Sequence, residues 1–579
     1  MNKITNLLKE LKKTKCDIYI LPASDEFLNE FVPQKNKRLQ WLTNFTGSNG
    51  IAFISEKKKV FFTDGRYLLQ AKKELDSDFR IFDQSKMGLV KFIEQSAKEK
   101  KFLMDTRLFS KELVKKLKTS SKQNKNKIIH DKDCILDKLW NSRVYSEKNT
   151  VYNLQLKFAG VSRDRKLKKF LDFYSKYDSI ILSSPESICW LLNIRGNGLE
   201  FTPVILCRVI VFYPIVHLFV EQDLINQLYF LKKKNIRIYS LDKFPLFIKK
   251  IKKSDKVYVD KNLSYYFYQI LISRTVKVDS DKDFCRLNKS QKNKTEIEVT
   301  KISHVYDGIA LVKFLYWLDN FGIKKEITEY DASEKLNSFR LKNKNFVSRS
   351  FPTIAACGEN GAIIHYTPKT MSKVLKKGES FLCDSGAQYY GATTDVTRTI
   401  ILGNEKPSDF LKAVYTDVLM GHIDISKLKF PKGTIGSQID VLGRNYLWKK
   451  GLDYNHGTGH GVGSFLSVHE SPPNISKKND NFELKPGMIL SNEPGCYLKN
   501  KFGVRIENLM IIKEDTNPGF LGFETLTLCP YQKKLIDKSK LNNGQITWIN
   551  KYNKKIWESL KNHLNEEERM WLKKNTKKL

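Results

Sequence analysis

The sequence Trp41-Leu-Thr-Asn-Phe-Thr-Gly-Ser-Asn-Gly50 returns about 150 residues later as Trp190-Leu-Leu-Asn-Ile-Arg-Gly-Asn-Gly198. An apolar segment precedes each copy and strand-like segments follow it, with helical periodicity between them. The glycines are expected to serve tight turns in which φ is positive. Two α/β domains of similar build explain the repeat better than a chance likeness of so short a stretch. The expected strands are 18–21, 51–54 and 60–63 in the first copy, and 180–182, 204–212 and 215–220 in the second.

A third unit begins near Asn293. Thr295-Glu-Ile-Glu298 has the pattern of a capping box that opens a long helix. Apolar residues then recur at steps of three and four, which predicts a buried helix face made of Ile302, Val305, Ile309, Val312 and Tyr316.

Beyond this helix, helical and strand-like segments alternate to about residue 537. The tail 544–579 is predicted to be helical, with Ile549, Tyr552, Ile556 and Leu560 on one stripe. We therefore predict three domains, covering residues 1–147, 148–288 and 289–579.

Composition indicates an ordinary globular protein with an unusual charge. The 579 residues are 41% hydrophobic and 28% charged, which favours several folded domains over disorder. The formal net charge of +38 would attract nucleic acid or an anionic membrane. The lysines recur in short runs without a nucleic-acid motif, so we read them as solvated surface and expect no nucleic-acid partner.

Cysteine usage and apolar patterning predict a cytosolic protein. Nine cysteines without a C-x-x-C pair indicate reduced thiols. Residues 1–15 lack the apolar centre of a secretory signal. The most apolar stretch, 201–220, contains Arg208, Pro214 and His217, which favours a buried strand pair over a membrane span. No membrane partner is expected.

Acidic and histidine residues of the third unit stand where strand patterns meet turns. Asp384 ends the apolar run Phe381-Leu-Cys383, and Asp395 opens Val396-Thr-Arg-Thr-Ile-Ile401. These two segments are expected to form a hairpin with both carboxylates on one face. Alone, either aspartate would more often be a cap or turn residue.

A glycine-rich segment and two glutamates follow. His456-Gly-Thr-Gly-His460-Gly-Val-Gly463 lacks the Gly-Lys-Ser/Thr signature of a phosphate loop. Glu493 and Glu507 each follow a strand-like run. Four carboxylates with one imidazole suit two divalent cations, and favour manganese, cobalt or zinc over copper. Each residue alone has an ordinary structural explanation, so their joint order carries the prediction.

These segments, in this order, closely resemble aminopeptidase P, the Xaa-Pro aminopeptidase family. The resemblance covers essentially the whole chain and matches the three-domain cytosolic form. The motifs that carry it are Thr63-Asp-Gly-Arg66-Tyr67, Trp190-Leu-Leu-Asn-Ile-Arg-Gly196, Phe351-Pro-Thr-Ile354, Gly361-Ala-Ile-Ile-His365-Tyr366, Asp384-Ser-Gly-Ala-Gln-Tyr389, Thr394-Asp395-Val-Thr-Arg-Thr399, His456 to Gly463, Val468-His469-Glu470, Glu493-Pro-Gly495, Arg505-Ile-Glu507-Asn508 and Leu526-Thr-Leu528.

The resemblance implies a fold and a metal centre. Two creatinase-like α/β domains would precede an α+β pita-bread catalytic domain that holds two Mn²⁺ ions and has a helical tail. The implied metal ligands are Asp384, Asp395, His460, Glu493 and Glu507, with Asp395 and Glu507 bridging.

The same resemblance assigns residues that bind or transform substrate. His365, His456 and His469 would contact substrate and the reacting carbonyl, and Tyr497 would be an active-site tyrosine. Arg66 would reach the substrate from the first domain, and Arg505 would hold a ligating carboxylate. Three departures, Ser471, Cys496 and Thr525, put the pocket's shape in doubt but replace no ligand.

The implied reaction removes the first residue of a peptide whose second residue is proline. A hydroxide activated by the two cations would attack the carbonyl before proline. Glu493 is the candidate that moves the proton to the leaving nitrogen, and His365 and His469 would stabilise the oxyanion. Proline's missing N–H and fixed φ allow a rigid apolar pocket to select it.

Two alternatives remain. A proline dipeptidase or a metal-free creatinase-like hydrolase would use the same fold, although the full ligand set and the duplicated N-terminal domains argue against them. A non-catalytic binding protein would use the positive charge instead. The family also implies a homodimer.

Overall fold

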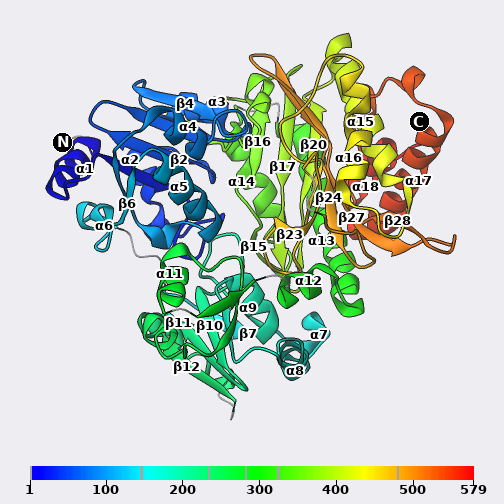
Figure 1. The fold of residues 1–579 in the computed structure, drawn as a ribbon. Helices are drawn as coiled ribbons and strands as arrows, with labels where there is room; N and C mark the ends of the chain where they lie inside the picture. The colour runs from blue at the N-terminus through cyan, green and yellow to red at the C-terminus, as the bar shows by residue number, and fades with distance from the viewer. Residues whose placement is uncertain are drawn as a thin grey trace. The chain divides into compact units, whose positions relative to one another are not determined.

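A computed structural model describes residues 3–143, 148–231, 235–274, 276–280, 283–322, 326–478 and 481–579. The chain divides into two compact units (Figure 1). The first contains Met1–Leu154 and Ser162–Cys285, and the second contains Gln155–Val161 and Arg286–Leu579. The predicted boundary at residue 147 lies outside the described residues. The predicted three-domain division stays a prediction.

The first unit holds two six-stranded sheets with the same strand order. One sheet has the order β4-β3-β2-β1-β5-β6 and the other has the order β12-β11-β10-β8-β13-β14. In the first sheet, β1 pairs antiparallel with β2 and parallel with β5. In the second, β8 pairs antiparallel with β10 and parallel with β13. The shared topology confirms the repeat that the two tryptophan-containing stretches predict.

The strand predictions agree with the observed strands to within a few residues. The strands of the first sheet are β1 (Ile18–Pro22), β2 (Ile51–Ser55), β3 (Lys59–Thr63), β4 (Phe79–Asp83), β5 (Lys101–Met104) and β6 (Lys127–His130). Those of the second are β8 (Ser179–Leu182), β10 (Cys207–Phe212), β11 (Ile215–Val220), β12 (Ile236–Ser240), β13 (Lys256–Val259) and β14 (Lys277–Asp279), and β7 (Val151–Asn153) pairs with β9 (Ile194–Gly196). The apolar stretch 201–220 contains the strand pair β10–β11.

Helices connect these strands. The helices of the first sheet's segment are α1 (Lys3–Lys13), α2 (Arg38–Thr43), α3 (Leu68–Glu74), α4 (Leu89–Ser96), α5 (Lys111–Gln123) and α6 (Ile135–Leu139), and those of the second are α8 (Arg163–Phe173), α9 (Pro185–Leu192), α10 (Phe244–Ile248) and α11 (Tyr265–Ser273). After the last strand, α12 (Phe284–Ser290) begins in the first unit and continues into the second.

The role predicted for the repeat's glycines is wrong. Within the two copies of the repeat, the residues with positive φ are Asn44 (63°) and Asn193 (50°), which cap the C-termini of α2 and α9. The glycines are instead needed for close packing. A Cβ on Gly47 would lie 2.4 Å from Phe45 Cζ, and one on Gly196 would lie 2.3 Å from a backbone oxygen.

In the second unit the long helix α13 (Lys294–Trp317) begins two residues earlier than its predicted capping box. Asn293 is the N-cap: its side chain accepts from the backbone N–H of Glu296, and the Glu296 carboxylate accepts from the Asn293 N–H. The Thr295 prediction is wrong because Asn is as good an N-cap as Thr and stands three residues before a glutamate.

The predicted buried face of α13 is also partly wrong. Val312 is fully buried, but Ile302 is 52% exposed. Buried positions include Thr300, His304 and Asp307, because this helix packs on more than one side and polar residues with partners fill part of its inner surface.

In its described residues, the second unit contains four sheets, and helices lie beside them (Figure 1). Helices α15 (Asp409–Ser426) and α16 (Gly436–Trp448) lie side by side, and a Cβ on Gly421 would come within 2.7 Å of the Gly443 carbonyl oxygen. The unit's other helices are α7 (Leu156–Ala159), α14 (Glu329–Arg340), α17 (Asn543–Leu560) and α18 (Glu566–Asn575).

The largest sheet of this unit has the order β21-β28-β27-β24-β22-β23, and smaller sheets are β16-β17-β20, β15-β18-β19 and β25-β26. The strands are β15 (Phe346–Arg349), β16 (Ile354–Cys357), β17 (Ser380–Ser385), β18 (Ala387–Tyr389), β19 (Ala392–Thr393), β20 (Val396–Ile401), β21 (Lys429–Pro431), β22 (Gly459–Gly461), β23 (Glu470–Ile475), β24 (Ile489–Asn492), β25 (Gly495–Leu498), β26 (Phe502–Arg505), β27 (Asn508–Glu514) and β28 (Phe520–Thr525).

The segments that carry Asp384 and Asp395 pair as predicted but form no simple hairpin. β17 and β20 are antiparallel, with Asp384 opposite Thr397. The residues between them form β18 and β19, which belong to a different sheet. The pairing is therefore right, and the connection is longer and structured.

The helical tail is confirmed. Ile549, Tyr552, Ile556 and Leu560 all lie on the buried side of α17. Among the described residues, no helix is long and apolar enough to cross a membrane. All nine cysteines are free and buried, as the prediction of reduced thiols requires.

Candidate metal centre

Strand register brings two glutamates together. β24 pairs antiparallel with β27 so that Asn492 lies opposite Asn508. Glu493 follows the first of these residues and Glu507 precedes the second, so both glutamates extend from the same end of this strand pair. Residues separated by 14 positions in the chain become neighbours in this way.

A threonine joins this end of the large sheet to the small sheet that carries the aspartates. Thr397 on β20 donates from Oγ1 to Glu507 Oε2 at 2.7 Å, and the Glu507 backbone N–H donates to the Thr397 carbonyl at 3.2 Å. Asp395 immediately precedes β20, two residues before Thr397, and its carboxylate lies within 4.8 Å of that of Glu507. Glu507 is thus fixed beside Asp395.

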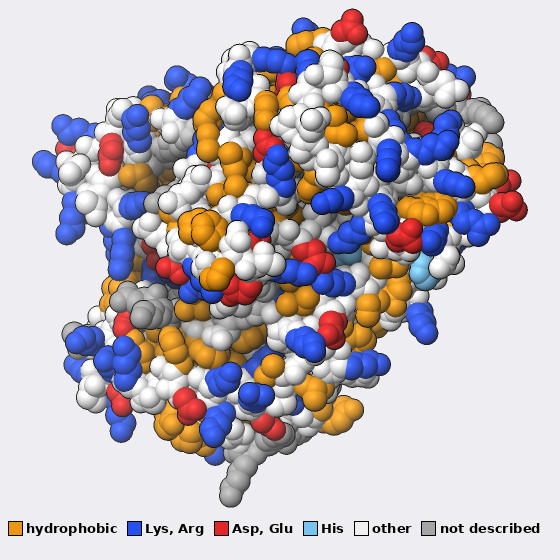
Figure 2. All heavy atoms as spheres, turned by 90° about the vertical axis from the view of Figure 1, so that its right-hand side faces the viewer, with side chains coloured by type: hydrophobic (Ala, Val, Ile, Leu, Met, Phe, Trp, Pro, Cys, Tyr) orange, Lys and Arg blue, Asp and Glu red, His pale blue; other side chains and the backbone are white. Residues whose placement is uncertain are grey.

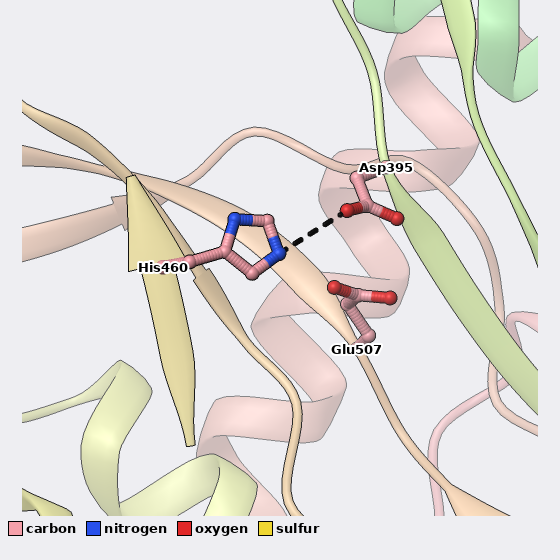
Figure 3. A group of neighbouring side chains, drawn as sticks. All are labelled: Asp395, His460 and Glu507. Carbon is pink, nitrogen blue, oxygen red and sulfur yellow. Dashed lines mark ion pairs between the residues drawn. The ribbon is translucent and has the colours of Figure 1, made fainter. Parts of the chain in front are cut away.

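His460 on β22 faces the carboxylates with one ring nitrogen. Its Nδ1 donates to the Gly461 carbonyl at 2.9 Å. Its Nε2 lies 3.5 Å from Asp395 Oδ2 and 3.4 Å from Glu493 Oε1. Figure 3 shows His460, Asp395 and Glu507 pointing toward one another, and their ligand atoms lie within 4.8 Å of one another. A neutral His460 in this tautomer presents its Nε2 lone pair to a cation.

Arg505 positions the fifth predicted ligand. Its Nη2 donates to Asp384 Oδ2 at 2.7 Å, and its Nε donates to Thr397 Oγ1 at 3.1 Å. Asp384 is therefore tied to the same threonine that binds Glu507. Arg505 thus binds the Asp384 carboxylate, and its predicted role of holding a metal-ligating carboxylate stays a prediction.

Two buried carboxylate oxygens in this cluster are available to bind a metal ion. Asp384 Oδ1 and Asp395 Oδ1 are buried and have no hydrogen-bond partner among the described residues. A buried carboxylate oxygen without a donor is costly unless a cation binds it. The side chains of Glu493 and His460 are 18% and 19% exposed, so the centre is open on their side.

The charges of the cluster also favour cations. Burial raises the pKa of Asp384 to about 7, with Arg505 opposing and Asp395 adding to the shift. Burial, followed by the charges of Asp395 and Glu493, raises the pKa of Glu507 well above its usual range. Burial alone would lower the pKa of His460, but Asp395 and Glu493 raise it to about 9. Crowded buried carboxylates resist joint ionisation, and divalent cations remove that conflict.

The predicted substrate-binding residues His456 and Tyr497 touch each other and the centre. His456 Nε2 is 2.8 Å from the Tyr497 hydroxyl, and His456 Nδ1 is 3.9 Å from Glu493 Oε2. Arg505 Nη1 donates to the same hydroxyl at 2.7 Å. Tyr497 therefore connects His456 to the arginine that holds Asp384.

The two other predicted histidines lie on connecting segments. His469 precedes β23, and its ring meets that of His460 edge to face with centroids 4.5 Å apart. His365 lies between β16 and β17, directly after Ile364, whose carbonyl accepts from Arg505 Nη2 at 3.4 Å. Both histidines are partly exposed.

Arg66 belongs to the first unit, where its guanidinium binds the Asp64 carboxylate at 2.8 Å. Its substrate contact stays a prediction, as do the other assigned roles.

Sequence reasoning missed residues that hold the predicted ones. Thr397 binds Glu507, and Thr399 exchanges hydrogen bonds with the Arg505 backbone at 3.0 and 3.1 Å. Their spacing from Asp395 in steps of two residues, near the start of β20, was the available signal. Glu470, beside His469, is buried between Lys289 (2.9 Å) and Lys292 (2.5 Å), and no local pattern indicates that triad.

Family comparisons agree with this geometry. The model of metallopeptidase family M24 matches residues 298–514, and that of the C-terminal region of the M24 peptidases matches 519–579. Two models of the creatinase/prolidase N-terminal domain match residues 3–132 and 142–296. The predicted fold class, two creatinase-like α/β domains followed by an α+β pita-bread domain, is confirmed.

Similar proteins match over the full length. Xaa-Pro aminopeptidase 1 of Dictyostelium discoideum is 38% identical, over 100% of this chain and 96% of the relative. Aminopeptidase P1 of Lotus japonicus is 34% identical, over 97% and 96%.

Two solved structures differ in how much of the chain they cover. The X-prolyl aminopeptidase of Caenorhabditis elegans, described as a cytosolic enzyme with a di-nuclear active site, matches with TM-score 0.95 and 29% identity over 100% of this chain and 99% of that one. The Xaa-Pro dipeptidase of Bacillus anthracis matches with TM-score 0.52 and 25% identity, over 99% of its own length but 64% of this chain. The chain belongs to the Xaa-Pro aminopeptidase family, the aminopeptidase P group of the M24 metallopeptidases.

Proposed function

We propose that this chain is a metalloaminopeptidase that hydrolyses the bond between the first residue of a peptide and a proline in the second position. One observation carries the proposal: buried carboxylates from two sheets converge with His460, and two of their oxygens have no hydrogen-bond donor among the described residues. Such a site is built for cations rather than for protein donors.

We assign the metal ligands as Asp384, Asp395, His460, Glu493 and Glu507. Four carboxylates and one imidazole form a hard donor set, and Mn²⁺ is our proposed ion. When bound, two divalent ions would polarise the scissile carbonyl and lower the pKa of an attacking water.

Glu493 is the proposed proton carrier. It lies on the open side of the centre, where Ser491 Oγ donates to its Oε1 at 3.2 Å. Burial, opposed by His460 and reinforced by Asp395, raises the pKa of Glu493, which is the direction that proton acceptance requires. It would take a proton from water and deliver it to the proline nitrogen as the C–N bond breaks.

His365 and His469 are the proposed donors to the oxyanion of the tetrahedral intermediate. The loss of one such donor typically lowers kcat by about 100- to 1000-fold. His456, Tyr497 and Arg66 would bind the rest of the substrate. Because the tertiary amide of proline has no N–H and a fixed φ, a rigid apolar pocket can select it.

A proline dipeptidase on the same fold is the rival function. The coverage of the dipeptidase structure favours the aminopeptidase, because 64% of this chain accounts for 99% of that protein. Comparing the hydrolysis of Ala-Pro-Ala with that of Ala-Pro separates the two activities. Faster turnover of the dipeptide would overturn the aminopeptidase proposal.

We further propose a cytosolic homodimer that binds no nucleic acid. The dimer rests on family membership, and sedimentation of the purified protein tests it. Lysine and arginine side chains are scattered over the face in Figure 2, interspersed with acidic and apolar side chains. Such a distribution is typical of a solvated surface and not of a single groove that binds a polyanion.

The deciding experiment measures metal content and activity on the same sample. The purified chain, loaded with Mn²⁺, should hold two ions and release the first residue from a short Xaa-Pro peptide. A chain that holds no metal, or that holds two and cleaves no such peptide, would refute the proposal.

A further inference from the structure

The segment that carries His365 is long and nearly free of regular structure. It joins β16 to β17 over residues 358–379, all of which the structure describes, and its only helix is the 3-10 turn Gly358–Ala362. Loops of this length within a compact domain need anchors if they are to hold a side chain in one place.

A single buried carboxylate supplies anchors along this loop. Glu329, the first residue of α14, is fully buried, with 0% of its surface exposed. Its Oε1 accepts from the Cys357 backbone N–H at 2.6 Å and from Asn360 Nδ2 at 3.0 Å. Its Oε2 accepts from the Tyr366 hydroxyl at 2.5 Å and from the Lys373 backbone N–H at 3.2 Å. One donor is the last residue of β16, and the other three are loop residues spread from Asn360 to Lys373.

The location of Glu329 stabilises the negative charge of its buried carboxylate. It occupies the N-terminal end of a twelve-residue helix, where the backbone dipole favours negative charge. Hydrogen bonds to a carboxylate are short and about twice as strong as neutral ones. Burial and Glu329 together raise the pKa of Tyr366 above its usual range, so the tyrosine hydroxyl stays a donor.

His365 is held on both sides by these contacts. Tyr366, which follows it, binds Glu329, and Ile364, which precedes it, accepts from Arg505 at 3.4 Å. Arg505 in turn binds Asp384 at 2.7 Å. The backbone at His365 is therefore fixed between the metal centre and Glu329.

We propose that Glu329 is a positioning residue of the peptidase: it holds the 358–379 loop so that His365 meets the developing oxyanion. This inference rests on the proposed function. The side-chain hydrogen bonds of Glu329 go to Cys357 and to the loop and not to a proposed metal ligand, so it acts through His365.

Glu329→Gln tests this role. Glutamine keeps the shape of the side chain but replaces one acceptor oxygen with an N–H donor. This N–H group would face either the donors of Tyr366 and Lys373 or those of Cys357 and Asn360, so the hydrogen bonds to that oxygen would be lost. A displacement of about 1 Å at a catalytic group costs about 100-fold in rate. We expect kcat for an Xaa-Pro peptide to fall by about 10- to 100-fold, with KM changed less and metal content unchanged.

Asp331→Asn is the matched control. Asp331 is an exposed residue of the same helix, and its carboxylate caps the helix start by accepting from the Thr328 backbone N–H at 2.9 Å and from Thr328 Oγ1 at 2.7 Å. Both of these hydrogen bonds go to Thr328 and neither goes to Glu329 or to a loop residue. The exposed substitution should therefore leave kcat within about twofold of the parent.

A double-mutant cycle separates positioning from general structural support. If Glu329 acts through His365, Glu329→Gln should lower kcat no further in a His365→Ala background. Equal losses of kcat in both backgrounds, or a loss of bound metal in Glu329→Gln, would overturn the proposal.

Tyr366→Phe provides the same test if Glu329→Gln fails to fold, because it removes one donor and leaves the carboxylate. It should lower kcat less than Glu329→Gln, and this effect too should vanish in the His365→Ala background. If Glu329→Gln and Tyr366→Phe both kept the kcat of the parent, the positioning role would be refuted. If the metal-loaded parent itself were inactive, the proposed function would be refuted instead.

Discussion

Glu470→Gln should destabilise the catalytic unit strongly. The Glu470 carboxylate binds Lys289 at 2.9 Å and Lys292 at 2.5 Å, and at most 3% of each of the three side chains is exposed. The substitution keeps the side chain's shape and removes the negative charge that two buried ammonium groups share. Removing one partner of a buried ion pair costs about 3–5 kcal/mol, because the remaining charge stays out of water.

This free energy converts into a measurable change in melting temperature. The second unit has about 300 residues. Unfolding entropy near 60 °C is about 2.1 cal/mol/K per residue, so a loss of 3–5 kcal/mol lowers Tm by about 5–8 °C. Differential scanning calorimetry of the parent and of Glu470→Gln measures this shift.

Two further variants locate the cause of the shift. Replacing Glu470 by Gln together with Lys289 and Lys292 by Met removes all three charges at similar volume, and should recover most of the lost stability. Glu483→Gln breaks an exposed pair with Lys485 and should change the free energy of unfolding by less than about 1 kcal/mol. A Tm loss below 2 °C for Glu470→Gln, or no recovery in the triple variant, would refute this reasoning.

Three other predictions follow from the site and its surroundings. Asp395→Asn should lose metal and turnover together; a variant that keeps two ions and parent-like kcat would contradict the ligand assignment. His469→Ala should lower kcat by about 100- to 1000-fold with metal content unchanged, and a loss of metal would make it a ligand instead. Burial, with help from Arg398, lowers the pKa of His422 to about 3, below about 6.5 in the unfolded chain. The unfolded state then binds the extra proton, so this stability is present above pH 6.5 and falls by up to about 1.4 kcal/mol per pH unit below it. His422→Gln should flatten the fall of Tm between pH 6.5 and 5, and an unchanged slope would exclude His422 as its source.

The network around His422 also links the carboxyl end of β24 to the amino end of β27, where Asn492 pairs with Asn508. Its Nδ1 donates to the Asn492 carbonyl at 3.0 Å, and its Nε2 lies 3.1 Å from Asn508 Nδ2 and 3.0 Å from the Tyr531 hydroxyl. Asn492 and Asn508 are the direct neighbours of Glu493 and Glu507. A neutral buried histidine therefore holds the backbone on which two proposed ligands stand.

Much of the architecture could be predicted from local sequence patterns. The repeated Trp41 and Trp190 stretches predicted two α/β domains of one build, and the two sheets have the same strand order. The stripe of Ile549, Tyr552 and Ile556 predicted the buried side of the last long helix. Such patterns are reliable because one element of secondary structure sets their period.

Predictions failed where two polar residues could each cap the same helix, or where a helix packs against neighbours on several sides. Asn293 rather than Thr295 caps α13, since both residues stand three positions before a glutamate. Ile302 is exposed although it fits the apolar period. The glycines of the repeat avoid steric overlap and do not provide positive φ.

The sequence by itself determined which side chains could form the site, because motif order and residue chemistry named Asp384, Asp395, His460, Glu493 and Glu507. Only the tertiary structure decided how they meet. The pairing of Asn492 with Asn508 brings the glutamates together, and Thr397 joins them to the aspartates. The buried carboxylates of Glu329 and Glu470 likewise find their donors far away in the chain. A local period cannot encode such contacts, because strand register and the satisfaction of buried charge depend on partners that folding alone brings near.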